Sequence, residues 1–433
     1  MDIYKQRRAE LLASIEADSI VILVGNIEQV RNKNICFPFR QDHDFYYLTG
    51  YAEPNAVAVL RPNASEPFIL FNQPKDDYQE VWFAARAGQQ GAIEQYGADS
   101  AFDIATFLQK IPELLGERKT IYLSDEQGRY HQYVFNWLDG QRKSVKFDQK
   151  KVFKQLHSVL PFIHQKRRIK DEHEIALIRQ ATQASVAAHK AVMQATRAGV
   201  KEHQLAALFM QKAGEFDCHD VGYPSIVAAG NNACCLHYSQ NNKALENGEL
   251  LLIDAGADYQ YYTADITRTY PVNGVFSSVQ KDLYQVVLNA LNAGINQVKP
   301  GANWDSIYAA AMKELAVGLH DLKIIEASVD EILDKSLHQQ YSLHKTGHWL
   351  GMDVHDVGSY HDNNGNWLSL EKNMIFTIEP GLYFPQNCMS VNEHFRGMGI
   401  RLEDDILVTA SGYENLTAEL PVEINDIENL MRG

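Results

Sequence analysis

The chain has 433 residues, a length that predicts two or three domains at roughly 100–200 residues each. Hydrophobic residues make up 45% of it and charged residues 22%, which is ordinary usage for a globular protein with a sizeable core. The formal net charge of -15 argues against a nucleic-acid partner, because phosphate binding needs a basic face.

The first residues, MDIYKQRRAELLASIEADS, are charged and helix-periodic and lack the apolar region of a signal peptide. The longest apolar stretches, such as IVILVG, are far shorter than the roughly 20 residues that a membrane span requires. The five cysteines are odd in number and include no CxxC pair, which indicates reduced thiols. We therefore expect a cytoplasmic protein without a membrane partner.

The N-terminal part alternates strand-like runs (SIVILVG, NAVAVL, PFILF, TIYLS) with helical stretches such as DIATFLQKIPELL. This alternation predicts an α/β domain with a mixed or parallel sheet over residues 1–170. A second domain is expected over residues 171–433. Asp171 and Glu174 have the spacing of a capping box at the start of its first helix, and Gly199 is a candidate C-terminal stop.

The second domain carries a faint internal repeat. One helix ends in RAG and is followed by VKEHQLAALFM, and another ends in KPG and is followed by ANWDSIYAAAM. Downstream, LIDAG around Asp254 resembles TIEPG around Glu379. A duplication would deliver one carboxylate from each half to a shared central site. Alternatively, the similarity between the two helix ends could arise by chance, because many helices end with the same capping residues.

The segment LLLIDAGADYQYYTADITRT predicts two strands joined by a glycine-containing turn. If the hairpin is centred near Tyr259 and Gln260, Asp254 and Asp265 lie opposite each other, with Cβ atoms about 5 Å apart. Two carboxylates that close repel unless a cation lies between them. The alternative is an ordinary hairpin with exposed acids.

Five side chains of the second domain adjoin apolar runs bounded by glycine, so each should be held at a strand or its end. They are Asp254, Asp265, His348, Glu379 and Glu403. Four carboxylates and one imidazole suit two divalent cations, which can together deprotonate one water. The set predicts a dinuclear metallohydrolase.

The segment HKTGHWLGMDVH adds His344 and His355 to His348, and His237 lies in ACCLHYSQ. Their spacing does not match the HExxH of zinc peptidases, and without a CxxC pair a structural zinc site is disfavoured. No GxSxG elbow is present, so a serine hydrolase is disfavoured as well.

Taken with their neighbours, these motifs resemble the pita-bread metallopeptidases, the family of aminopeptidase P, prolidase, creatinase and methionine aminopeptidase. The matching segments are LHYSQN, LLLIDAGADYQYYTADITRTYPVNG, HWLGMDVHDVG, TIEPGLY and GIRLEDDILVT. The N-terminal segments FPFRQDHDFYYLTGY and VWFAARAGQQGA resemble aminopeptidase P in particular. The resemblance implies an α+β protein, with a creatinase-type α/β N-terminal domain before a C-terminal pita-bread domain of pseudo-twofold symmetry.

For the metal site, the resemblance implies two Mn²⁺ per chain, with Co²⁺ or Zn²⁺ as possible substitutes. Asp254 would bind one metal and His348 the other, while Asp265, Glu379 and Glu403 would contact both. The implied reaction is attack of a metal-bridging hydroxide on the bond before a proline in the second position, with Glu379 as general base.

The resemblance also implies residues around the substrate. His237, His344 and His355 would face it, with His237 and His355 donating hydrogen bonds during catalysis, and Arg401 would support the metal-site carboxylates. Tyr383 and, from a neighbouring subunit, Trp82 are expected in the proline pocket. The expected assembly is a homo-oligomer, a dimer or tetramer.

Alternatives remain open at this stage. Prolidase shares the five ligands but accepts only dipeptides. Methionine aminopeptidase lacks an N-terminal domain of this length, and creatine hydrolysis uses the fold without metal. Some pita-bread proteins are metal-free peptide binders or chaperones, but their ligand positions are typically substituted, whereas all five are intact here.

Overall fold

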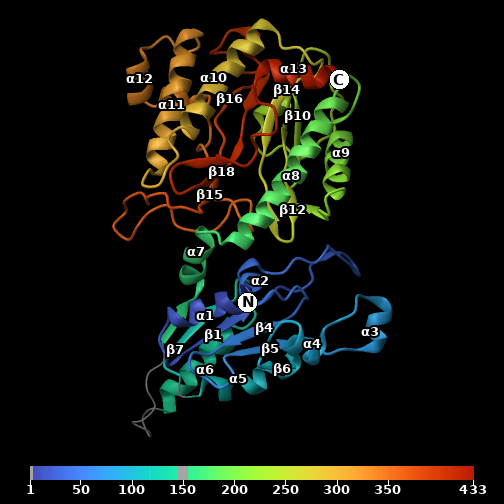
Figure 1. Cartoon of the computed structure of the whole chain (residues 1–433), viewed down its shortest axis with the longest axis vertical. Helices are drawn as coiled ribbons and strands as arrows, with labels where there is room; N and C mark the ends of the chain where they lie inside the picture. The colour runs from blue at the N-terminus through green and yellow to red at the C-terminus, as the bar shows by residue number, and fades with distance from the viewer. Residues whose placement is uncertain (1–2, 117, 145–154) are drawn as a thin grey trace. The chain divides into compact units, whose positions relative to one another are not determined.

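The computed structural model describes residues 3–116, 118–144 and 155–433. The chain divides into two compact units, Met1–His164 and Gln165–Gly433 (Figure 1). Each unit has its own apolar core. The chain passes from the first unit to the second within one helix, α7 (Leu160–Arg168).

The other helices and strands described in the first unit are, in chain order, α1 (Ile3–Ala13), β1 (Ser19–Val24), β2 (Val30–Asn32), β3 (Ile35–Cys36), α2 (His43–Thr49), β4 (Val57–Leu60), β5 (Phe68–Asn72), α3 (Asp77–Trp82), α4 (Gly88–Glu94), β6 (Ser100–Asp103), η1 (Ile104–Thr106), α5 (Phe107–Leu115), β7 (Thr120–Ser124), α6 (His131–Ser144) and β8 (Gln155–Ser158).

The first unit is built on a six-stranded sheet in the order β6-β5-β4-β1-β7-β8. The apolar runs predicted as strands form β1, β4, β5 and β7, which are buried throughout. Strand β1 pairs antiparallel with β4 and parallel with β7, so the sheet is mixed, as the alternation of strands and helices allowed. Such continuous apolar runs are typical of strands that are covered on both faces.

The elements of the second unit after α7 are α8 (Glu172–Ala195), α9 (Glu202–Gly214), β9 (Asp220–Val221), β10 (Ile226–Ala229), η3 (Gly230–Cys234), β11 (Leu250–Asp254), β12 (Ala257–Tyr259), β13 (Tyr262–Thr263), β14 (Thr267–Pro271), α10 (Ser278–Ile295), α11 (Trp304–Asp321), α12 (Val329–Asp334), η4 (Leu337–Gln340), β15 (Ile375–Ile378), β16 (Gly381–Phe384), η5 (Glu393–Phe395), β17 (Met398–Arg401), β18 (Asp404–Val408), β19 (Tyr413–Asn415) and α13 (Ile424–Arg432).

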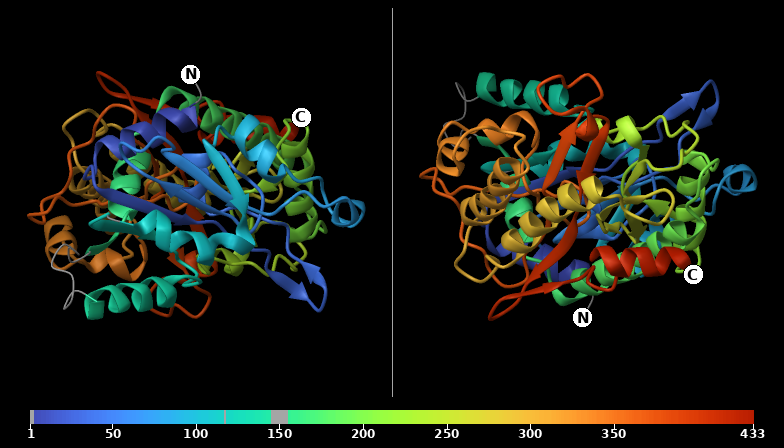
Figure 2. Two further views of the ribbon diagram at one scale, coloured as in Figure 1. Left: turned by 90° about the horizontal axis from the view of Figure 1, so that it is seen from below. Right: turned by 90° about the horizontal axis from the view of Figure 1, so that it is seen from above.

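In the second unit, short antiparallel strands lie between two helix pairs (Figure 1). Helices α8 and α9 flank the strands on one side, and α10 and α11 flank them on the other. The view from above in Figure 2 also places α9 (green) and α12 (orange) at opposite ends of this unit. Among the described residues, no helix is both long and apolar enough to cross a membrane.

Helix α8 begins where the sequence predicts. Asp171 accepts a hydrogen bond from the Glu174 N–H, and the Glu174 carboxylate accepts one from the Asp171 N–H, which is a complete capping box. The helix does not reach Gly199, however. It ends at Ala195 with Thr196 as its cap, and Gly199 instead takes a φ of 88° in the turn that leads to α9.

The two halves of the second unit repeat the same hydrogen bonds. The N–H of Gly199 donates to the Leu245 carbonyl, and the N–H of Gly301 donates to the Leu370 carbonyl, both at 2.9 Å. Each leucine N–H in turn donates to the carbonyl of the residue after the glycine, at 2.8 and 2.7 Å. The glycines share nearly the same positive φ, 88° and 86°. Helix capping alone does not produce these long-range bonds, so the repeat is structural.

The same repeat positions the first acid of each half. Asp254 is the last residue of β11, and Glu379 directly follows β15. Strand β11 pairs antiparallel with β14, and β15 pairs antiparallel with β18. The pseudo-twofold relation therefore brings one strand-end carboxylate from each half towards the centre of the unit.

The predicted register of the aspartate hairpin is wrong. Asp254 pairs with Thr267 rather than with Asp265. The turn residues are Gln260 and Tyr261, with φ values of 50° and 73°, which is the two-residue turn whose twist suits antiparallel strands. The true centre lies one residue later than predicted, so Asp265 is diagonal to Asp254. An offset of two residues keeps both carboxylates on one face, because strand side chains alternate.

Gly256, the glycine of this hairpin, allows two backbone segments to approach closely and is not part of the turn. A Cβ atom added to Gly256 would lie 1.7 Å from the Ala264 carbonyl oxygen, a backbone atom that cannot rotate away. We expect Gly256→Ala to lower the free energy of unfolding by roughly 1–3 kcal/mol, the cost typical of overpacking, as measured by thermal or denaturant unfolding. Gly214→Ala at the end of α9 is the control, since a Cβ there meets nothing within 4 Å. Equal stability of the two variants would contradict this account.

Candidate active site

A pocket of about 690 Å³ opens in the second unit, between its two repeated halves. It contains all five predicted metal ligands, and the three histidines of the 344–355 segment line it together with His237. Its lining consists of Tyr223, Pro224, Ile226, Leu236, His237, Tyr238, Ser239, Asp254, Asp265, His344, Lys345, Gly347, His348, Val354, His355, Tyr360, Glu379, Arg401 and Glu403.

The local fold explains why these side chains converge. Asp254 ends β11, and Asp265 lies between β13 and β14. Glu379 follows β15, and Glu403 lies between β17 and β18. His348 precedes the isolated bridge between residues 349 and 376, which ties its segment to β15. Each side chain therefore leaves a hydrogen-bonded backbone, as the sequence predicts.

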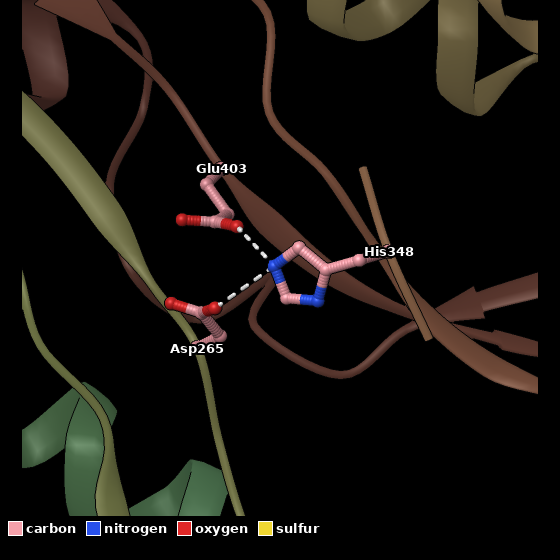
Figure 3. A group of neighbouring side chains, drawn as sticks. All are labelled: Asp265, His348 and Glu403. Atoms are coloured by element: carbon pink, nitrogen blue, oxygen red, sulfur yellow. Dashed lines mark ion pairs between the residues drawn. The ribbon is translucent and has the colours of Figure 1, made fainter. Parts of the chain in front are cut away.

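Three of these residues form one compact donor set (Figure 3). The carboxylates of Asp265 and Glu403 both face the same ring nitrogen of His348, at 3.3 and 4.0 Å from Nε2. One ligand atom from each residue lies within 4.8 Å of the others. Asp265 and Glu403 are buried, so the set is not an incidental surface cluster.

Glu379 and Asp254 both adjoin this set. The Glu379 Oε1 atom lies 3.7 Å from His348 Nε2, and its Oε2 atom lies 3.5 Å from His344 Nδ1. The hydroxyl of Tyr223 is in hydrogen-bond contact with both Asp254 and Asp265. The five residues thus form one continuous centre.

The cluster of carboxylates is electrostatically unfavourable without a cation. Burial and the charge of Asp254 raise the pKa of Asp265 well above its ordinary value. Burial and the charge of Asp265 do the same to the pKa of Glu403. Burial and Glu403 raise the pKa of Glu379 to about 8. Neighbouring acids and poor solvation both penalise the ionised forms.

Asp254 is the exception, because it has a permanent counter-charge. Arg401 Nη2 lies 2.6 Å from Asp254 Oδ2. Although burial opposes ionisation, Arg401 and the Tyr223 hydroxyl hold the pKa of Asp254 below its usual value. Arg401 also donates to Thr267 Oγ1 at 3.2 Å, and that hydroxyl donates to Glu403 at 2.7 Å. Arg401 therefore contacts Asp254 directly and Glu403 through Thr267.

A bound cation fits these residues. Within the described part of the chain, no lysine or arginine pairs with Asp265, Glu379 or Glu403, so their repulsion has no fixed compensation. His348 Nδ1 lies 3.1 Å from the Trp349 carbonyl, which favours the tautomer with Nδ1 protonated and Nε2 free as a ligand atom. Oxygen donors with one imidazole suit hard or borderline divalent ions.

The remaining histidines stand around the donor set. The His355 ring packs edge-on against His348, with centroids 4.3 Å apart. Burial and His348 lower the pKa of His355, and burial and Arg401 lower the pKa of His344 to about 4. Both rings are therefore neutral at pH 7, and each carries one N–H that can donate. His237 lines the same pocket from the other half of the unit.

Two residues predicted to bind substrate, Tyr383 and Trp82, are not among the residues that line the pocket. Tyr383 is 1% exposed, and its hydroxyl lies between His344 Nε2 at 2.7 Å and Arg401 Nη1 at 3.0 Å. Its hydroxyl thus contacts two residues of the pocket lining from behind, and Tyr383 is not itself a lining residue. Trp82 ends α3 in the first unit, and its side chain is 68% exposed.

The sequence reasoning missed Tyr223, Thr267 and Asp405. The Asp405 carboxylate accepts from the Asp265 N–H at 3.2 and 3.3 Å and so fixes the backbone beside a predicted ligand. Thr267 lies two residues after Asp265 on the same strand face and could have been found from that alternation. Tyr223, in VGYPS, has no neighbouring motif that would single it out.

Comparisons with known proteins agree with this geometry. The model of metallopeptidase family M24 matches residues 176–410, and that of the aminopeptidase P N-terminal domain matches residues 4–122. The Xaa-Pro aminopeptidase of Haemophilus influenzae is 36% identical over 99% of this chain and 96% of its own length. That of Escherichia coli is 35% identical over 99% and 97%.

Solved structures give the same result. Pseudomonas aeruginosa aminopeptidase PepP superposes with a TM-score of 0.95 at 38% identity, covering 99% of this chain and 97% of that one. Zinc-substituted Escherichia coli aminopeptidase P in complex with product superposes with a TM-score of 0.94 at 34% identity, covering 99% and 98%. These matches extend over both units and identify the architecture of the second as the pita-bread fold.

Proposed function

Because the chain belongs to the Xaa-Pro aminopeptidases of metallopeptidase family M24, and is thus a metallo-exopeptidase, we propose that it releases the N-terminal residue from peptides with proline in the second position. The observation that carries this proposal is the donor set of Asp265, His348 and Glu403, which adjoins Glu379 inside a peptide-sized pocket. Proline has no amide N–H and a fixed φ, so cleavage before it needs a dedicated site.

We propose that the site holds two divalent cations, Mn²⁺ in the first instance, with Co²⁺ or Zn²⁺ able to replace it. Asp254 would bind one and His348 the other, while Asp265, Glu379 and Glu403 would contact both. When bound, the cations would supply an activated water as nucleophile and would polarise the substrate carbonyl.

The chain's own groups would then complete the reaction. Glu379 would take the proton of the attacking water and pass it towards the leaving proline nitrogen. His237 and His355 would donate hydrogen bonds to the carbonyl oxygen as negative charge develops on it. The free α-amine of a substrate would bind a metal or Asp254, which would explain exopeptidase action.

The groups around these residues have supporting roles in this proposal. Arg401 would hold Asp254 and, through Thr267, Glu403 in place. His344 would face the substrate with its orientation fixed by the Tyr383 hydroxyl. We retain Tyr383 and Trp82 as candidate proline-binding residues, the latter from a neighbouring subunit of a dimer or tetramer. A cytoplasmic location is also proposed.

The test is hydrolysis of Xaa-Pro and Xaa-Pro-Yaa peptides by metal-free protein reconstituted with Mn²⁺. Release of the first residue from the tripeptide would establish the aminopeptidase. Cleavage of the dipeptide alone would make the chain a prolidase. Cleavage of neither, with two metals bound, would favour a peptide-binding protein.

We expect His355→Ala to lower turnover by roughly 10–100-fold while leaving the bound metals in place, because its ring would donate to the transition state rather than bind a cation. Steady-state kinetics and elemental analysis of the same preparation provide the measurement. His361→Ala is a matched control, since the His361 ring packs against Trp367, with centroids 4.1 Å apart, in the same loop. Loss of metal from His355→Ala would contradict the assignment.

A further inference from the structure

Glu202 is a fully buried acid of the second unit for which the proposed reaction has no use. It is the first residue of α9, and its side chain has no exposure to solvent. Its Oε1 atom accepts hydrogen bonds from the Ala229 N–H and the Asn232 side-chain amide, both at 2.9 Å. Its Oε2 atom accepts from the Tyr238 hydroxyl at 2.9 Å and the Lys243 N–H at 2.8 Å. The carboxylate thus has a full set of four donors.

These donors are all neutral groups. Across residues 3–116, 118–144 and 155–433, no basic side chain pairs with Glu202, and the Lys243 ammonium is directed instead to Glu249. Burying a charge without a counter-ion is costly, so a role in local packing alone would be better served by an apolar residue. The four hydrogen bonds offset that cost. The carboxylate in turn orders the groups that donate them.

The donors all belong to one segment, residues 229–243, which we call the His237 segment. Glu202 bonds to both of its ends, at Ala229 and Lys243, and to Asn232 and Tyr238 within it. The backbone on each side adds to the attachment, because the N–H of Glu202 donates to the Lys243 carbonyl at 3.0 Å. A single carboxylate therefore fixes a loop that has little regular structure of its own beyond η3.

The segment carries His237 into the pocket. Tyr238, the next residue, is 8% exposed and points its hydroxyl to Glu202, whereas His237 is exposed and lines the pocket. Among the described residues, no group hydrogen-bonds to the His237 ring, so its orientation depends on the backbone that Tyr238 holds. His355 and His344, in contrast, have ring partners in the donor set or beside it.

We propose that Glu202 is a positioning residue for His237: it holds the His237 segment so that this imidazole faces the substrate carbonyl. The proposal rests on the proposed function, in which His237 donates a hydrogen bond to that carbonyl. A neutral glutamine cannot replace the carboxylate. Its amide NH₂ group is a donor, so two of the four donors around it would lose their acceptor.

The test is a double-mutant cycle with an Xaa-Pro-Yaa peptide and Mn²⁺-loaded protein. Glu202→Gln is expected to lower kcat/KM about tenfold, mostly through kcat, with the metal content unchanged. In a His237→Ala background the same change should cost less than about twofold, because the group that Glu202 positions is gone. The proposal would be overturned if Glu202→Gln lowered kcat/KM by the same factor in both backgrounds. Loss of metal from Glu202→Gln would overturn it as well.

Two further variants keep the result interpretable. Tyr238→Phe removes only the hydroxyl that links Glu202 to the residue beside His237, and it should show the same coupling if Glu202→Gln folds poorly. Glu249→Gln removes a nearby carboxylate that contacts Lys243 but not Tyr238, so its effect should be the same in both backgrounds.

A readout independent of activity separates this proposal from the proposed function. In zinc-loaded protein with ¹³C-labelled histidine, the His237 ring signal should shift or broaden in Glu202→Gln and remain unchanged in Glu249→Gln. An unchanged His237 signal in Glu202→Gln would reject the positioning role even in an active enzyme. Absence of peptide cleavage by the wild-type chain, with the signal shifted as expected, would reject the proposed function alone.

Discussion

Asp265→Ala is expected to leave the chain unable to bind two divalent cations. Asp265 faces His348 Nε2 at 3.3 Å and shares the Tyr223 hydroxyl with Asp254, so its removal would take a donor from both proposed metal sites. Activity should fall by more than the roughly 10–100-fold typical of removing an outer partner of a metal ligand. Elemental analysis after gel filtration, with kinetics on the same sample, provides the measurement.

The matched control for this experiment is Asp258→Asn in the same hairpin. Asp258 accepts a hydrogen bond from the Tyr261 N–H at 3.2 Å, and asparagine keeps that acceptor. The control should retain two metals per chain. Two metals in Asp265→Ala would show that Asp265 is not required to hold either ion.

Glu379→Gln is expected to lower kcat by at least roughly 100-fold, the usual contribution of a general base. Glutamine has nearly the same shape but cannot take a proton from water. Burial and Glu403 raise the pKa of Glu379 to about 8 before any cation is bound, which shows how strongly this position favours a proton. The measurement is kcat on a tripeptide substrate, with metal content determined in parallel.

The metal content decides how the Glu379→Gln result is read. Loss of metal together with activity would assign Glu379 to binding, whereas loss of kcat alone supports the base role. Glu371→Gln on the preceding turn is the control, because that side chain is 57% exposed and its charged neighbour is Arg168, at 3.9 Å. Near-normal turnover in Glu379→Gln would reject the base assignment.

Local patterns predicted much of the fold. The apolar runs of the first unit, the capping box of α8 and the location of each predicted ligand beside a strand all follow from residues within a few positions of one another. The internal repeat was also visible, because the same glycine and acid recur in both halves. Such features depend on hydrophobic periodicity and local backbone preference, and both can be read from a short stretch of sequence.

The register of the aspartate hairpin could not be predicted in the same way. Gln260 and Tyr261 adopt positive φ values although neither is a residue that favours them, and Gly256, which looked like the turn glycine, is required for a close backbone approach instead. The pairing of β11 with β14 overrides the weak local preference of the turn residues.

The sequence by itself therefore determined the donor types, their order and the strand ends that hold them. Only the tertiary structure decided which groups surround each donor. Arg401 reaches Asp254 across 147 residues of sequence, and Thr267 reaches Glu403 across 136. These contacts arise when two half-units pack face to face. Burial and mutual repulsion then set the pKa values of the acids, and neither quantity exists until distant segments meet.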